Sequence, residues 1–194
     1  MFSTEPDDAE TTGWAVAAAA GDRAAAAAFI RATQQSVRRF LAHLVDPGEA
    51  EDLAQETYLR AMGALPRFAA RSSARTWLLA IARRVAADHV RTIVRRPRSS
   101  GHEDWQTRAE AAQVDVAPRV EEMVVLRQLL RDLPTDRREA FVATQVAGLS
   151  YAEAAEVCGC PVGTIRSRVA RARQDLVDAL READDPPRHL RSIG

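Results

Sequence analysis

The stretch of sequence that decides the fold spans residues 149–176 and reads LSYAEAAEVCGCPVGTIRSRVARARQDL. Ser150 is a candidate helix cap, and Glu153 follows at the spacing of a capping box. Gly159 can supply the positive φ that ends a helix, and Pro161 suits the first turn of the next one. The pattern therefore predicts a helix-turn-helix.

The second of these helices has two different faces. Its apolar positions recur at helical spacing and predict one buried stripe: Ile165, Val169, Ala172, Leu176 and Leu180. The opposite face carries hydroxyls and arginines: Thr164, Arg166, Ser167, Arg168 and Arg171. Guanidinium groups bind guanine edges and phosphates, so this face suits a DNA major groove. An ordinary solvated face is the alternative, but the cap, the Gly turn and the basic helix together favour DNA binding.

Composition indicates an all-α protein with small cores. The chain has 194 residues, of which 46% are hydrophobic and only 5% aromatic. Much of the hydrophobic content is alanine, and alternation of the strand type is absent. We therefore expect thin helix-to-helix seams rather than one large core.

Charge is balanced over the whole chain but divided into blocks. Nine arginines stand against Asp88 alone between Arg67 and Arg98, whereas acids outnumber bases between Gly101 and Glu122. Such blocks predict two basic surfaces separated by an acidic connector. The expected organisation is an acidic disordered tail (1–12), a first helical domain (13–97), a flexible linker (98–118), a helix-turn-helix domain (119–183) and a second disordered tail (184–194).

Several classes of function lack the residues they need. Cys158 and Cys160 have no nearby histidine, so we expect them to pack the turn as small apolar groups rather than to hold a metal. The four histidines are scattered and no Gly-rich phosphate loop is present. We expect no enzyme activity, no catalytic residue, no cofactor and no metal. The sequence also has neither a secretory signal nor an apolar run long enough to span a membrane, which favours a cytoplasmic protein.

A docking face is predicted on the helix that follows the Asp46-Pro47-Gly48-Glu49 start signal and runs to about residue 65. Acid, amide and leucine side chains lie together on it at helical spacing: Asp52, Gln55, Glu56 and Leu59. Acidic residues also suit the dipole of a helix N-terminus, which accounts for part of the pattern. The combination with an exposed leucine still favours a protein-docking surface.

A single-stranded nucleic-acid surface is predicted on a basic loop at 66–74 and the helix from about 74 to 95. Arginines interleaved with an aromatic ring supply charge for phosphates and a plane for stacking. Trp77 has a competing interpretation as a core anchor, beside Leu78, Ile81 and Val85, and we favour that one. Trp105, inside the linker, is a candidate surface anchor.

These residues carry a resemblance to a known family. DLAQETYLRA at 52–61 and FAARSSARTWLLAIARRVAADHVR at 68–91 resemble the sigma-2 domain of group IV bacterial sigma factors, the extracytoplasmic-function type of the sigma-70 family. The segment at 130–173, which contains LPTDRREAF and GTIRSRVARAR, is similar to their sigma-4 domain. Both matches come in the order usual for the family.

The resemblance implies an alternative sigma factor that binds core RNA polymerase and directs initiation at promoters. The docking face would bind the clamp of the largest polymerase subunits, and the second domain their flap. The first domain would hold melted −10 DNA through nine residues: Arg71, Ser72, Ser73, Arg75, Trp77, Arg83, Arg84, Arg91 and Arg95. The second domain would read −35 duplex DNA through the hydroxyl-and-arginine face of its last helix. Further implied features are a cytoplasmic location, association with the nucleoid within the holoenzyme, and an anti-sigma factor as a candidate partner.

One position departs from the family pattern. The family often has Asn after the IAR that follows TWL, where it lines a pocket for a flipped −10 base; this chain has Arg84. The substitution puts the specificity of that pocket in question and should raise its affinity for phosphate.

Two further hypotheses follow from the charge blocks and the motif order. The free protein is inhibited when the acidic tail, the linker or a separate anti-sigma protein covers the basic faces. The alternative class is a stand-alone helix-turn-helix regulator, which has no need of the docking face or the arginine-rich helix.

Overall fold

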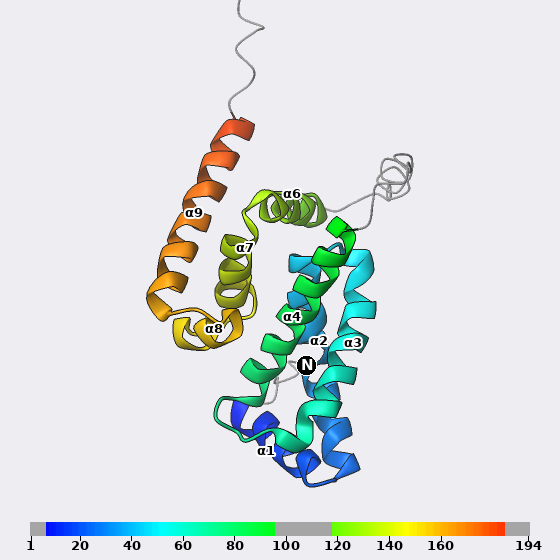
Figure 1. Cartoon of the computed structure of the whole chain (residues 1–194). Helices are drawn as coiled ribbons and strands as arrows, with labels where there is room; N and C mark the ends of the chain where they lie inside the picture. Colours follow the sequence, from blue (N-terminus) through cyan, green and yellow to red (C-terminus); the bar gives the residue numbers. More distant parts are fainter. Residues whose placement is uncertain (1–6, 96–117, 185–194) are drawn as a thin grey trace, which may run out of the picture.

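The computed structural model describes residues 7–95 and 118–184, and every regular element in those two ranges is a helix (Figure 1). The all-α fold and its two helical domains are confirmed. Most of the predicted linker, including Trp105, and nearly all of the second tail fall outside the described residues. No helix within them has the length and apolarity required to cross a bilayer.

The first domain is built from four helices, α1 (Asp8–Ala19), α2 (Arg23–Leu44), α3 (Ala50–Ala64) and α4 (Ala74–Arg95). Its centre contains large side chains from α2 and α4 that are almost inaccessible to solvent: Phe29, Phe40, Leu41, Leu78 and Leu79. One prediction was wrong here. Helix α1 begins at Asp8, with the Asp7 carboxylate accepting from the amide of Glu10, so the acidic segment at 1–12 is helical over its second half.

Side-chain caps explain where these helices begin. The Asp22 carboxylate accepts hydrogen bonds from the amides of Ala24 and Ala25 at the start of α2, at 2.8 and 3.0 Å. The Asp46 carboxylate accepts from the Gly48 amide at 2.9 Å, but only a 3₁₀ turn, η1 (Pro47–Glu49), forms before α3. The α-helix itself therefore begins at Ala50, directly after this turn.

The start of α4 is held from two directions. The Ser73 hydroxyl accepts from the amide of Thr76, at 3.1 Å. In addition, the Thr12 hydroxyl on α1 accepts from the amide of Ala74, at 3.0 Å. Two of the amides that a helix N-terminus leaves unpaired are thus satisfied, one of them by a residue far away in sequence. Helix α1 thereby fixes the end of the basic loop, which follows a second 3₁₀ turn, η2 (Leu65–Arg67).

The second domain contains α6 (Pro118–Asp132), α7 (Thr135–Phe141), α8 (Tyr151–Cys158) and α9 (Val162–Asp184). The predicted capping box is present: Ser150 Oγ accepts from the Glu153 amide at 3.2 Å, and a Glu153 carboxylate oxygen accepts from the Ser150 amide at 2.9 Å. Gly159 has the predicted left-handed conformation, with φ of 64°. After Phe141 the chain leaves the α form of α7 and continues as a π turn, η3 (Val142–Val146).

The prediction of a buried apolar stripe on α9 is confirmed at four of its five positions. Ile165, Val169, Ala172 and Leu176 are buried, the first three at 1% exposure or less. Leu180 is 47% exposed, so the prediction that it belongs to the buried stripe was wrong.

The two domains pack against each other along α4. Helix α8 lies beside α4, while η3 and α6 contact α2 (Figure 1). One continuous cluster of buried apolar side chains includes Leu78 and Val85 of α4 together with Val142, Val157 and Ile165 of the second domain. The described residues therefore form one closed body, in which α4 belongs to both halves.

Candidate nucleic-acid interface

The predicted docking face lies on the outer side of α3. Asp52, Gln55 and Leu59 are exposed, Leu59 to 71%, and Glu56 is half-exposed. The inner side of the same helix is buried in the core through Leu53, Ala54, Thr57 and Ala61. The structure thus brings together the four residues that the sequence placed on one face.

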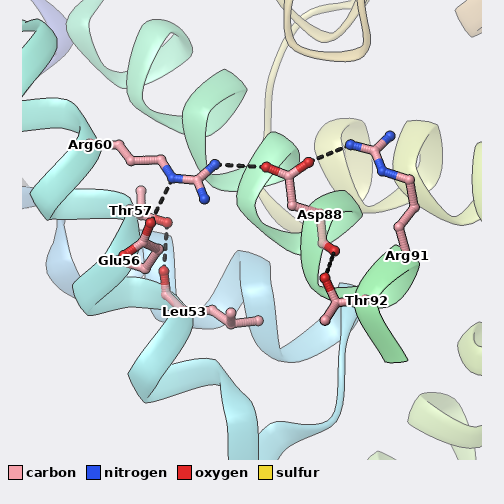
Figure 2. A network of polar contacts seen from close by, with 7 residues as sticks. All are labelled: Leu53, Glu56, Thr57, Arg60, Asp88, Arg91 and Thr92. Carbon is pink, nitrogen blue, oxygen red and sulfur yellow. Dashed lines mark hydrogen bonds and ion pairs between the residues drawn. The ribbon is translucent and has the colours of Figure 1, made fainter. Parts of the chain in front are cut away.

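A chain of charges links this face to the arginine-rich helix (Figure 2). The Arg60 guanidinium donates to the Glu56 carboxylate at 2.7 Å and to one oxygen of the Asp88 carboxylate at 2.8 Å. The other Asp88 oxygen accepts from Arg91. The hydrogen bond from Arg60 is the larger cause, and that from Arg91 the second, of a lowered pKa of Asp88. Asp88, the acid that interrupts the arginine block, thus holds an arginine on each side.

The remaining basic residues of the first domain differ in exposure. Arg71, Arg84, Arg91 and Arg95 are exposed, whereas Ser72 and Ser73 are half-buried. In the basic loop Ala70 has a positive φ of 49°, a conformation that residues other than glycine adopt at some cost. Trp77 is half-buried against the core, and its ring packs against that of Phe68 in a tilted arrangement, with centroids 5.0 Å apart and 47° between the planes. Trp77 thus packs against the core as an anchor would, while part of its side chain stays exposed to solvent.

Part of the predicted −10 surface is covered by the second domain. Arg83 donates from Nε to the carboxylate of buried Glu139 on α7, at 2.8 Å. Arg75 donates to the carbonyl oxygen of Ala147, which follows η3. Beside it, the Thr76 hydroxyl donates to the Glu153 carboxylate at 3.3 Å. Among the described residues, the helix-turn-helix domain therefore covers Arg75, Thr76 and Arg83 of α4, while half of the acidic tail and most of the linker lie outside them.

Helix α9 keeps most of its polar face in solvent. Arg166, Ser167 and Arg171 are exposed, and Thr164 is half-buried, its carbonyl oxygen accepting from the Ser167 hydroxyl at 2.9 Å. Arg168 differs from them, because it turns toward α7 and pairs with Asp136 at 3.1 Å. Four of the five predicted residues thus share the outer side of the helix, and Arg168 faces the protein.

The two cysteines lie at the turn between α8 and α9 and pack against the core. Cys158 is buried, and burial raises the pKa of its thiol to about 12, so it stays protonated at neutral pH. Cys160 is half-buried, with its sulfur 3.6 Å from an Arg168 nitrogen. Among the described residues no group of three or more His, Cys, Asp or Glu is placed to hold a metal ion.

Sequence reasoning missed several residues that the structure makes important. Arg60 had a local signal, since it lies four residues after Glu56 on the same helix. Glu139 and Glu153 were noticed only as parts of motifs. Their partners Arg83 and Thr76 are 56 and 77 residues away in sequence, and no local pattern records such a pairing.

Two family models match the chain. The model for sigma-70 region 2 covers residues 29–96, and the model for sigma-70 region 4 covers residues 123–176. The first contains the docking face, the basic loop and α4; the second contains the helix-turn-helix.

Curated relatives match over nearly the whole length. The "ECF RNA polymerase sigma factor SigC" of Mycobacterium tuberculosis (strain CDC 1551 / Oshkosh) is 55% identical over 185 residues, which is 95% of this chain and 98% of the relative. The "RNA polymerase sigma-H factor" of Pseudomonas aeruginosa is 35% identical over 170 residues, covering 82% and 88% of the two chains.

Solved structures show the same architecture. CnrH, in complex with the cytosolic domain of CnrY, aligns with a TM-score of 0.70 over 91% of this chain and 99% of its own, at 24% identity. The sigma factor RpoE of Bartonella quintana, in complex with the anti-sigma factor NepR, aligns with a TM-score of 0.61 at 27% identity, covering 78% and 94%.

The chain belongs to the sigma-70 family of RNA polymerase sigma factors, in its extracytoplasmic-function group. It is accordingly an alternative sigma factor, a protein that binds core RNA polymerase and directs transcription initiation at promoters. Members of this family are initiation factors, which position polymerase on DNA.

The charge chain around Asp88 generates a first prediction. Asp88→Asn should release Arg60 and Arg91, so that the first domain binds single-stranded −10 DNA more tightly. In a plot of the logarithm of affinity against the logarithm of salt concentration, the slope should become steeper by the amount that corresponds to about one additional phosphate contact. Asp132→Asn, at an exposed position on α6, removes the same charge elsewhere and should leave the slope unchanged. Equal slopes in both variants would show that Asp88 does not restrain the arginines.

Proposed function

We propose that three separate faces of this chain perform the three steps of promoter engagement. Asp52, Gln55, Glu56 and Leu59 on α3 bind the polymerase clamp. The basic loop and α4 hold the melted −10 strand, and the outer side of α9 reads the −35 duplex. The observation that best supports this assignment is that α9 is buried on one side only. Its apolar stripe is buried, while Arg166, Ser167 and Arg171 lie in solvent.

Different physical interactions serve the two DNA elements. An α-helix fits the major groove, and a bidentate arginine contact to guanine discriminates between bases by ~1–3 kcal/mol. Single-stranded DNA offers phosphates to the exposed arginines of α4 and bases that can stack, each stacked base adding ~1–3 kcal/mol. Duplex reading fixes the position on DNA, and strand capture stabilises the melted region.

Arg84 modifies the second of these steps. It is exposed on α4 at the position where the family often has Asn. A guanidinium there adds a phosphate contact rather than a pocket for one base. The −10 interaction of this sigma factor therefore depends more on charge and less on the identity of the flipped base.

The described arrangement also favours inhibition of the free protein. Arg75 is bound to Ala147 in the turn that precedes α8, and Arg83 is bound to Glu139 on α7. A DNA strand therefore cannot reach both arginines while the domains are closed. The outer side of α9 stays accessible, so closure blocks the −10 step and not the −35 step. If the closed form outnumbers the open form by about 100 to 1, the −10 affinity of the free chain falls about 100-fold.

Binding to polymerase opens the domains in this scheme. An anti-sigma factor is a further candidate partner; the solved complexes with CnrY and NepR are the observation in its favour. The protein acts in the cytoplasm, associates with the nucleoid as part of the holoenzyme, and catalyses no reaction of its own. A stand-alone helix-turn-helix regulator, the other class considered, would not retain core polymerase in a pull-down, whereas this chain should.

Reversing one charge on the docking face tests the polymerase assignment. Glu56→Arg should abolish binding to core polymerase, because it places a cation where an anion faces outward and also repels Arg60. Pull-down with purified core polymerase measures this, and circular dichroism reports the fold. Glu182→Arg, exposed on α9, changes the net charge equally and should still bind. Retained binding by Glu56→Arg would remove α3 from the interface.

Truncating the outer side of α9 tests the −35 assignment. Arg166→Ala should weaken binding to a −35 duplex and relax the base preference at one position, by ~1–3 kcal/mol for a bidentate contact. Arg181→Ala, in the last turn of the same helix, removes an equal charge from a position beyond the predicted contacts. Competition between duplexes with single base changes, at one salt concentration, compares the two. Identical specificity profiles would contradict this reading of α9.

Weakening the ion pair between the domains tests closure. Glu139→Gln keeps the size of the side chain but loses the charge that holds Arg83, so the free chain should bind a −10 single strand several-fold more tightly. Glu156→Gln, exposed on α8, should not change the affinity. Retention of −35 duplex binding shows that the second domain still folds. Unchanged −10 affinity in Glu139→Gln would mean that the pair does not limit access to α4.

A further inference from the structure

A pocket exists only because the two domains close. It has a volume of about 400 Å³ and is lined from five helices, α2, α4, α7, α8 and α9. Its wall on α2 and α4 is largely apolar and includes Leu44, Ala86, Ala87 and Val90. A volume of this size lies within the range of small-molecule sites.

Charged side chains from both domains also line the pocket, and two of them, Arg83 and Arg91, lie on α4 itself. The charged lining residues of the pocket are four arginines and two acids: Arg83, Arg91, Arg138, Arg168, Asp136 and Glu139. Glu139 neutralises Arg83 at 2.8 Å, and Asp136 neutralises Arg168 at 3.1 Å. Arg91 is held by Asp88 at the exposed rim. Both acids that line the pocket therefore already form an ion pair with an arginine other than Arg138.

Arg138, on α7, differs from the other arginines that line the pocket. Its Nε is buried and has no hydrogen-bond partner among the described residues, and one terminal nitrogen lies 3.5 Å from the carbonyl oxygen of Arg131. Burial is the main cause of a lowered pKa of this guanidinium; the nearby Glu139 carboxylate opposes the shift, and nearby Arg131 adds to it. An arginine keeps its proton even so, and buried charges are ordinarily paired. Among the described residues Glu139 is thus near Arg138 but makes its ion pair with Arg83, and the Nε of Arg138 lacks an acceptor.

We propose that this pocket binds a small molecule carrying a phosphate or diphosphate group, which favours the closed arrangement of the two domains. The planar fork of Arg138 suits a phosphate group, which it can contact through two nitrogens at once. The apolar wall of α4 takes the uncharged part of the molecule. Because the ligand touches both domains, it binds the closed form better than the open one and shifts the population toward it. The proposal rests on the proposed closure of the free chain.

Inorganic pyrophosphate is a suitable first probe. Titration calorimetry at constant ionic strength should show binding to the full-length chain, weakened roughly tenfold or more in Arg138→Gln. Arg138→Lys, which keeps the charge but not the fork, should be intermediate. Arg137→Gln is the matched control, because its neighbouring guanidinium pairs with Asp175 at 2.6 Å and does not line the pocket. Equal affinities in Arg138→Gln and Arg137→Gln, or no binding at millimolar concentrations, would overturn the proposal.

A second readout separates a free ligand from DNA phosphate. Saturating pyrophosphate should lower the affinity of the wild-type chain for a −10 single strand and should have little effect on Arg138→Gln. If Arg138→Gln instead weakens the single strand and leaves pyrophosphate binding intact, Arg138 binds the DNA backbone and the proposed site is wrong.

Small-angle scattering distinguishes failure of the pocket from failure of closure. A free chain that is compact but does not bind pyrophosphate contradicts the pocket alone. A free chain that is extended, with or without pyrophosphate, contradicts closure and the pocket together. A compact chain whose Arg138→Gln variant folds normally and loses pyrophosphate binding supports both.

Discussion

The rest of the closed structure depends on the ion pair between Arg83 and Glu139. Glu139 is buried, and a carboxylate in that position requires a cation, because the cost of removing a charge from water is large. The cation is supplied by the first domain, so the pair fixes which side of α4 the second domain covers. The contacts of Arg75 with Ala147 and of Thr76 with Glu153 lie along the same side. The outer side of α9 remains free as a result.

Helix α4 is the element that contacts the other three helices of the first domain and also the second domain. Its apolar side belongs to the core of the first domain, its N-terminus is fixed by Thr12 of α1, and its basic side meets the second domain. The Arg60–Asp88 contact then joins it to α3, the helix proposed to bind polymerase. A change in how α3 is held therefore reaches the arginines of α4 through one shared carboxylate. Exposed ion pairs such as Arg60–Asp88 are individually weak, so this contact can break and re-form at little cost in free energy.

Sequence reasoning succeeded where a structural signal is local. The capping box at Ser150, the left-handed Gly159 and the start of α4 all depend on residues within a few positions of one another. It failed where the partner is distant. Leu180 continues the stripe of α9, but its side chain stays largely in solvent, so periodicity alone overestimated its burial. Arg168 was predicted to belong to the polar face of α9, yet it pairs with Asp136 of another helix and turns inward. The docking face was recoverable because one helix carries all of it; the contact between domains was not.

The covered side of α4 has a consequence for competition. A guanidinium accepts a carboxylate and a phosphate with the same geometry, so Glu139 occupies Arg83 in the way that a DNA strand would. Because both belong to one chain, the carboxylate competes at an effective concentration of millimolar order. DNA free in solution at lower concentration is outcompeted. If α4 holds the −10 strand as proposed, DNA already placed beside this helix in a polymerase complex would have a comparable effective concentration, so closure would favour assembled promoter complexes over free DNA.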